Sequence, residues 1–148
     1  MLLGGCQEMH ELGAITRSSA RPTTDCIARV FKGQGGQSVE TGQRYVGKRY
    51  ARIYGVDAKA LGDVVEMWLP DGGPQVQAFV FPNSDGGAVV DLGVVWMGPG
   101  YPPQQVGAIA DAMTALEKGL ADHCAVDFTS ARRERKGDDV KAYFAGRD

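Results

Sequence analysis

A chain of 148 residues is the usual size of a single domain, and its 43% hydrophobic and 23% charged residues are ordinary for a globular protein. The 16 basic and 18 acidic side chains give a formal net charge of -2, which excludes a nucleic-acid binder that works by bulk positive charge. The 21 glycines and seven prolines predict many tight turns and argue against an all-helical bundle.

The first informative residues stand at the amino end, where Leu3-Gly4-Gly5-Cys6 places a leucine and two small residues before a cysteine. This tetrapeptide resembles the lipobox of bacterial lipoproteins. The resemblance implies that the thiol of Cys6 is diacylated and that Cys6 becomes the first residue after cleavage. It also implies a start codon upstream of Met1, because a signal peptide needs a basic segment and an apolar run of about 7–15 residues. Gln7, in place of an aspartate, implies sorting to the outer membrane. The alternative is a cytoplasmic protein that matches the motif by chance.

Residues 7–22 show no sustained hydrophobic period, so we expect a flexible tether in front of a single domain over residues 23–148. Helix-capping residues follow at Thr23-Thr24-Asp25. Apolar residues then recur at helical spacing as far as Gly33, which predicts a short first helix.

Four strands are expected next, because stretches rich in β-branched and aromatic residues alternate with glycine-rich turns. They cover Arg44–Tyr54, Val64–Leu69, Val76–Phe81 and Ala88–Met97. The short connections predict an antiparallel meander. Apolar residues then recur at three- and four-residue steps from Val106 to Cys124, which predicts a long amphipathic helix. A last short helix is expected over Asp138–Ala145.

This order of elements predicts an α+β fold. We expect a two-layer sandwich in which a four-stranded antiparallel meander sheet carries the N-terminal and C-terminal helices on one face. Three cysteines are an odd number for an exported protein, but acylation of Cys6 leaves one pair. Because Cys26 and Cys124 lie on the apolar stripes of the two helices, we expect a disulfide between them if the protein is periplasmic. In a cytoplasmic protein they would be two buried thiols.

Two sets of residues are candidates for contact with a partner. The first is a group of cations on the first expected strand, suited to an acidic partner or to anionic lipid headgroups: Arg44, Lys48, Arg49 and Arg52. The alternative interpretation is a charged edge strand that resists pairing with neighbours. The second set follows from period-two alternation, which leaves bulky apolar groups on the sheet face away from the helices: Trp68, Phe79, Phe81 and Val95. The alternative is that the tails or residues 126–148 cover them.

Residues suited to catalysis are scarce. His10 and His123 are the only histidines, so a histidine-based triad or metal site has little to build on. Glu66 and Asp91 would act as a carboxylate pair only if the strand register placed them together on one face. The glycines at 33–36 lack the Gly-Lys-Ser/Thr ending of a phosphate-binding loop. We therefore expect no enzymatic activity, no metal and no cofactor.

The sequence favours a non-enzymatic lipoprotein of the outer membrane that faces the periplasm and binds a protein partner or envelope component through its sheet. Such a protein would serve as an accessory subunit of an envelope assembly or transport system. A second hypothesis is a periplasmic inhibitor or immunity protein that presents acidic loop residues, such as Asp71 and Asp85, to a lytic enzyme. A third is a cytoplasmic module that holds a small ligand between sheet and helices, which requires Cys26 and Cys124 to be reduced.

Overall fold

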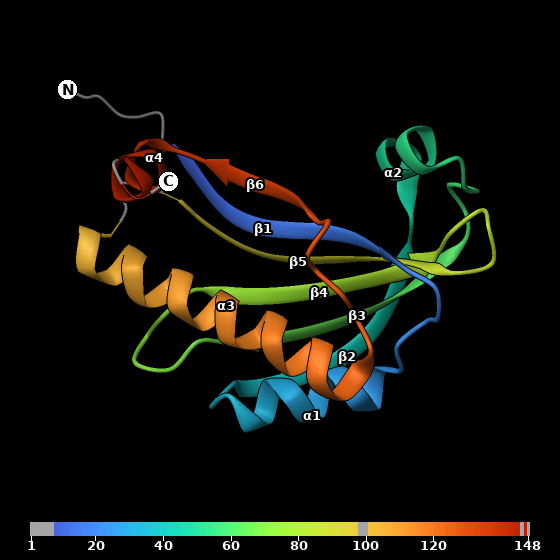
Figure 1. Ribbon diagram of the computed structural model, residues 1–148, viewed down its shortest axis with the longest axis horizontal. Coiled ribbons are helices and arrows are strands. Elements are labelled where there is room, and N and C mark those ends of the chain that lie inside the picture. Colours follow the sequence, from blue (N-terminus) through green and yellow to red (C-terminus); the bar gives the residue numbers. More distant parts are fainter. Residues whose placement is uncertain (1–7, 98–100, 146, 148) are drawn as a thin grey trace.

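The computed structural model describes residues 8–97, 101–145 and 147, which form an α+β fold around one antiparallel sheet (Figure 1). Within these residues there are six strands and four helices. The strands are β1 (Met9–Ser18), β2 (Gln37–Tyr45), β3 (Leu61–Trp68), β4 (Gln75–Pro82), β5 (Ala88–Met97) and β6 (Arg132–Lys136). The helices are α1 (Thr24–Gly33), α2 (Gly47–Tyr54), α3 (Pro103–Cys124) and α4 (Asp138–Phe144).

The sheet runs in the order β2-β3-β4-β5-β1-β6, and each neighbouring pair is antiparallel. The strands from β2 to β5 form a meander, while β1 inserts between β5 and β6. The expected α+β class and antiparallel sheet are therefore confirmed. The expectation of four strands is wrong, because the sheet has six.

The tether expected over residues 7–22 is also wrong where the structure describes it. Met9–Ser18 forms β1, which pairs with β5 on one side and β6 on the other. Two polar side chains on this strand, His10 and Thr16, point into the core, so apolar residues do not alternate clearly along it. His10 is 2% exposed and stacks on Trp96, with ring centroids 5.5 Å apart. The Thr16 hydroxyl donates a hydrogen bond of 2.8 Å to the carbonyl oxygen of Asp127. The domain thus includes residues that the sequence pattern assigned to a linker.

The two helices with clear periodicity form as predicted. At the start of α1 the Thr23 hydroxyl oxygen accepts a 3.1 Å hydrogen bond from the backbone N–H of Cys26. This cap satisfies one of the free N–H groups of the first turn. Helix α3 ends at Cys124 and is followed by Ala125 in the left-handed conformation. Figure 1 shows α1 and α3 side by side along one side of the sheet.

The main core lies between these two helices and alternate residues of the sheet. Phe31 of α1 and Leu116 and Leu120 of α3 are fully buried in it. The strands contribute side chains at every second position, as the alternation predicted, including Val65, Met67, Ala78, Val80, Leu92 and Val94. We call this the helix face of the sheet and the opposite side the open face.

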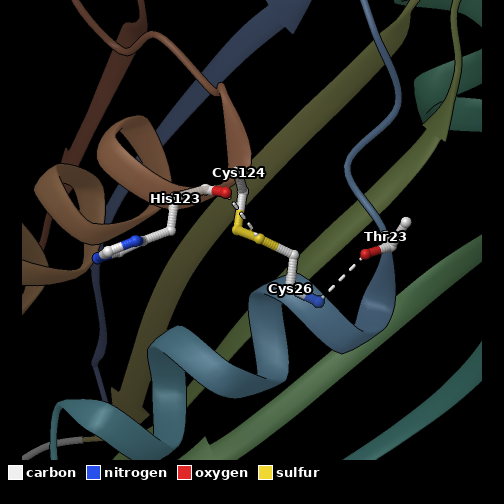
Figure 2. The surroundings of a disulfide bond; sticks show 4 residues. All are labelled: Thr23, Cys26, His123 and Cys124. Carbon is white, nitrogen blue, oxygen red and sulfur yellow. Dashed lines mark hydrogen bonds between the residues drawn. A yellow bond between two sulfur atoms is a disulfide. The ribbon is translucent and has the colours of Figure 1, made fainter.

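A disulfide joins the two helices over the helix face. The sulfur atoms of Cys26 and Cys124 are 2.09 Å apart, with Cα atoms at 5.9 Å (Figure 2). The bond connects the first turn of α1 to the last residue of α3, residues 98 positions apart in sequence. The expected pairing of these two cysteines is present in the structure.

The strand expected over Arg44–Tyr54 is wrong beyond Tyr45, because helix α2 follows. Gly47 has a φ of 86° and Gly55 a φ of 65°, so a glycine with positive φ stands at each end of this helix. Between them Tyr50 and Tyr54 are one helical turn apart and point to the same side. The tyrosines have a strong tendency to form strands, but packing against the sheet outweighs it.

The charged segment after α3 forms an edge strand and a short helix. The strand β6 consists of Arg132, Arg133, Glu134, Arg135 and Lys136 and pairs only with β1. The predicted last helix is confirmed as α4, whose Val140 is fully buried in the main core. None of the helices within the described residues is long and apolar enough to cross a membrane.

Candidate functional site

The open face is covered at one end only. Tyr50 and Tyr54 of α2 pack onto Phe79 and Phe81 of β4, with the Tyr50 and Phe81 rings 5.1 Å apart and the Tyr54 and Phe81 rings 5.6 Å apart. These contacts bury Phe79 and Phe81 almost completely. The expectation that they belong to an uncovered patch is therefore wrong, because helix α2 covers them where the sequence pattern predicts a strand.

Beyond the reach of α2 the same face leaves large apolar side chains in solvent. Trp68 of β3 is 49% exposed and Val95 of β5 is 46% exposed, as the period-two pattern predicted. Two methionines add to them at the end of the sheet where β1 begins. Met9 and Met97 are direct cross-strand partners and are 47% and 54% exposed. We call Met9, Trp68, Val95 and Met97 the apolar patch.

A shallow depression of about 230 Å³ lies between α2 and the apolar patch. Its side toward the patch is formed by Val95, Gln75 and Glu11, and Gly93 lines it as well. Gly93 pairs directly with Gly13 of β1, so two adjacent central strands lack side chains at this point of the face. Peptide backbone is therefore accessible there to a side chain of a partner.

The side of the depression toward α2 carries a hydrogen-bonded pair. The Tyr50 hydroxyl donates to the carboxylate of Asp91 on β5. Burial raises the pKa of Asp91 above the ordinary aspartate value, although the hydrogen bond from Tyr50 opposes this rise. Burial, together with the neighbouring Asp91 charge, raises the pKa of Tyr50. The pair fixes α2 on the sheet and places a hydrogen-bonding group at the edge of the depression.

The four cations predicted as a partner site are all exposed but lie on two elements. Arg44 is on β2, where its guanidinium carbon sits 4.2 Å from the centre of the Phe79 ring. Lys48, Arg49 and Arg52 are on the solvent side of α2. Because α2 packs on the open face, these cations lie at the end of that face opposite Met9 and Met97. The open face thus has an apolar end and a basic end.

The two carboxylates considered for acid-base chemistry do not form a pair. Glu66 and Asp91 both lie on the open face, but β4 separates their strands. Glu66 accepts a 3.2 Å hydrogen bond from Gln77, whereas Asp91 accepts one from Tyr50. Among the described residues, no three His, Cys, Asp or Glu side chains are grouped closely enough to hold a metal ion.

The acidic loop residues considered for inhibition of an enzyme differ from each other. Asp85 accepts hydrogen bonds from the side chain of Asn83 and from the backbone of Gly87, both at 3.0 Å. Its carboxylate is thus occupied in shaping the loop between β4 and β5. Asp71 is exposed in the turn between β3 and β4, with a φ of 61°.

The third hypothesis, a small-ligand module, required reduced cysteines and free space between the sheet and the helices. The disulfide joins the cysteines, and side chains of the main core fill the space between α1 and the sheet. A hollow of about 470 Å³ remains between α3, α4 and the edge of the sheet formed by β1 and β6. Cys6 and the rest of the lipobox-like motif lie outside the described residues.

Sequence reasoning missed three contributors to the open face. The strand predicted over Arg44–Tyr54 includes Tyr50, although its spacing from Tyr54 between two glycines is a helix signal. The tether predicted over residues 7–22 includes Met9. Met97 closes a strand that was correctly predicted, but only the register with β1 places it beside Met9. No protein-family model matches the chain, and no curated protein is detectably similar to it.

Proposed function

We propose that the protein is a non-enzymatic binding protein whose open face captures a protein partner. The observation that carries the proposal is the contrast on one sheet. The helix face is closed by α1 and α3, whereas the open face leaves the apolar patch in solvent beside a depression with hydrogen-bonding groups. Exposed apolar side chains gathered at one end of a sheet face, with polar side chains such as Gln75 between them, are typical of protein interaction sites.

The two ends of the open face fit different parts of such a partner. Trp68 offers the large amphipathic surface that dominates many interfaces, and Val95 and the methionines extend it. Arg44, Lys48, Arg49 and Arg52 at the other end attract an acidic rim and speed association. The partner we expect therefore has an apolar centre flanked on one side by carboxylates.

We further propose that the protein is a lipoprotein anchored through Cys6 to the periplasmic side of the outer membrane. Because β1 begins at Met9, only two residues, Gln7 and Glu8, separate the anchor from that strand, and the three Cα–Cα steps from Cys6 to Met9 span at most roughly 11 Å. The domain would sit against the membrane rather than at the end of a long tether. Its partner would then be a membrane-associated component, as in an accessory subunit of an envelope assembly or transport system.

The binding proposal is tested by replacing Trp68 with Glu and isolating complexes from detergent-treated whole-cell extracts of cells that carry the gene. A carboxylate at the centre of an apolar interface stays desolvated and unpaired, so retention of the partner should fall at least about a hundredfold. The melting temperature should change little, because the side chain is half exposed.

Leu61→Glu is the matched control. Leu61 is 48% exposed, like the residues of the patch, but alternation along β3 puts it on the opposite face from Val64 and away from the open face. This variant should keep the partner. Equal loss in both variants would show a general effect of added charge, and full retention by Trp68→Glu would refute the assignment of the patch.

The anchor is tested separately by the intact mass of the protein made from its gene with the upstream DNA included. A lipid adduct on Cys6, together with the loss of two hydrogens at Cys26 and Cys124, is the expected result. A reduced chain that begins at Met1 would refute the lipoprotein proposal and leave the binding proposal to stand on its own test.

A further inference from the structure

The two edges of the sheet differ in how they are protected. At one edge, four of the five residues of β6 are Arg or Lys, and such a short, highly charged strand resists pairing with another chain. At the other edge, β2 is nine residues long and contains one acidic and one basic residue, Glu40 and Arg44. Every residue of β2 except Val39 is exposed, and Tyr45 is 66% exposed. The β2 edge is therefore open to a further strand.

The backbone groups that β2 presents to solvent follow from its pairing with β3. Just after β2, the Val46 N–H donates to the Ala60 carbonyl at 2.9 Å in the same register that pairs Tyr45 with Leu61. In an antiparallel ladder, residues whose N–H and C=O groups bond to one neighbouring strand alternate with residues whose N–H and C=O groups point to the opposite side. The N–H and C=O groups of the odd-numbered residues, including Thr41 and Gln43, thus point to the free edge.

The side chains of β2 are complementary to a second copy of the same strand. If two β2 strands pair antiparallel about a two-fold axis at Gly42, Thr41 faces Gln43 of the other copy, and their outward backbone groups can bond to each other. Glu40 then faces Arg44 of the other copy on the open face. When the Arg44 guanidinium turns from the Phe79 ring toward the edge, this ion pair forms twice. Opposite charges directly across an antiparallel pair are favourable.

The same register relieves a repulsion within the chain. Glu40 is the direct cross-strand partner of Glu66 on β3, and like charges in this position are destabilising. No basic residue of β2 or β3 lies in that row. In the symmetric pair, Arg44 of the second copy would enter the row next to Glu40. Glu66 would thereby gain a cation on its side of the sheet.

We propose that the β2 edge is a homodimer interface, in which two copies join their sheets through antiparallel β2 strands centred on Gly42. The irregular register between Gln37 and Glu40, where Ser38 has a φ of 53°, limits the paired segment to the end of β2 that carries the complementary residues. This interface lies at the sheet edge and leaves the apolar patch free in each copy.

The proposal is tested by sedimentation velocity on Glu40→Arg and Arg44→Glu as separate variants. Each variant places like charges opposite each other twice in the dimer, so the dissociation constant should rise about tenfold to a hundredfold over that of the wild type. Mixing the two variants restores opposite charges at both positions. The mixture should form a one-to-one dimer although each variant alone is monomeric at the same concentration.

Thr41→Pro is an independent variant that does not depend on charge. Proline removes an N–H that points to the free edge, so the pairing of β2 with β3 is kept while pairing with a second copy is lost. Its melting temperature, measured at a concentration where the wild type is monomeric, checks that the fold is intact. A wild type that stays monomeric up to its solubility limit would overturn the proposal, as would variants that fail to associate when mixed.

Discussion

The helix face and the open face of the sheet are made by alternate residues of the same strands, yet they differ in what covers them. On β5, Leu92 and Val94 point to the helix face and are buried beneath the helices, whereas Asp91 and Val95 point to the open face. Helices α1 and α3 cover the helix face, and a disulfide joins these two helices. The open face has one short helix at one end.

This difference separates stability from recognition. The apolar area buried against α1 and α3 supplies most of the hydrophobic stabilisation. Most of the large buried side chains belong to the main core, and only a few lie under α2. Side chains of the apolar patch are half exposed, so their removal costs the fold little. A surface of this kind can be optimised for a partner without loss of the core.

The largest expected effect concerns the disulfide over the helix face. Replacement of both Cys26 and Cys124 by Ser should lower the free energy of unfolding by about 4–5 kcal/mol, the chain-entropy value for a loop with a sequence separation of 98. Urea denaturation with and without a reductant measures it. The reductant should destabilise the wild type and leave the double variant unchanged. A double variant as stable as the oxidised wild type would contradict the role given to the bond.

The next effect compares two neighbouring valines of β5. Val94 is 1% exposed on the helix face and Val95 is 46% exposed on the open face. Val94→Ala should cost about 2–3 kcal/mol, because it removes two buried carbon atoms and leaves a cavity. Val95→Ala, the same chemical change one residue later, should cost less than about 1 kcal/mol. Equal losses in urea denaturation would show that the open face is covered in solution.

A smaller, pH-dependent effect is expected at Asp91. Since burial raises its pKa in the folded state, the stability linked to its protonated form is present below pH about 3.9 and is lost as the pH rises through the folded pKa. The side chain in Asp91→Asn cannot ionise, so the stability of this variant relative to the wild type should increase as the pH rises through that range. Thermal melts of both proteins between about pH 3 and pH 7 measure the difference. A difference that does not vary with pH would contradict the raised pKa.

The smallest effect is expected at the basic end of the open face. Replacement of Lys48, Arg49 and Arg52 by Gln should change the free energy of unfolding by less than about 0.5 kcal/mol per residue, because all three side chains are exposed. Binding of the partner should instead become slower and less sensitive to salt. Association rates at two salt concentrations test this, and rates equal to those of the wild type would restrict recognition to the apolar end.

Much of the helix face could be predicted from sequence. The periodicity from Val106 to Cys124 gave α3, and the capping residues before Cys26 gave α1. The disulfide expected between Cys26 and Cys124 then predicts that the two helices lie next to each other. These signals are local, because they depend on spacing within one element or on a single covalent bond.

The open face was predicted less completely, because it depends on contacts between distant segments. Alternation along β4 placed Phe79 and Phe81 on that face correctly, but it could not show that α2 covers them. The strand β1 was missed because its inward side chains include the polar His10 and Thr16. Their burial is possible only through neighbours that the linear sequence does not reveal.

The measurement that tests the central claim most directly is photo-cross-linking in living cells that carry the gene. A photoreactive amino acid is placed at position 68 on the open face or at position 61 on the opposite face of β3, which has similar exposure. The account predicts a discrete adduct with one protein from position 68 and none with it from position 61. Absence of an adduct at position 68, or the same adducts from positions 68 and 61, would contradict the claim that the open face is the recognition surface.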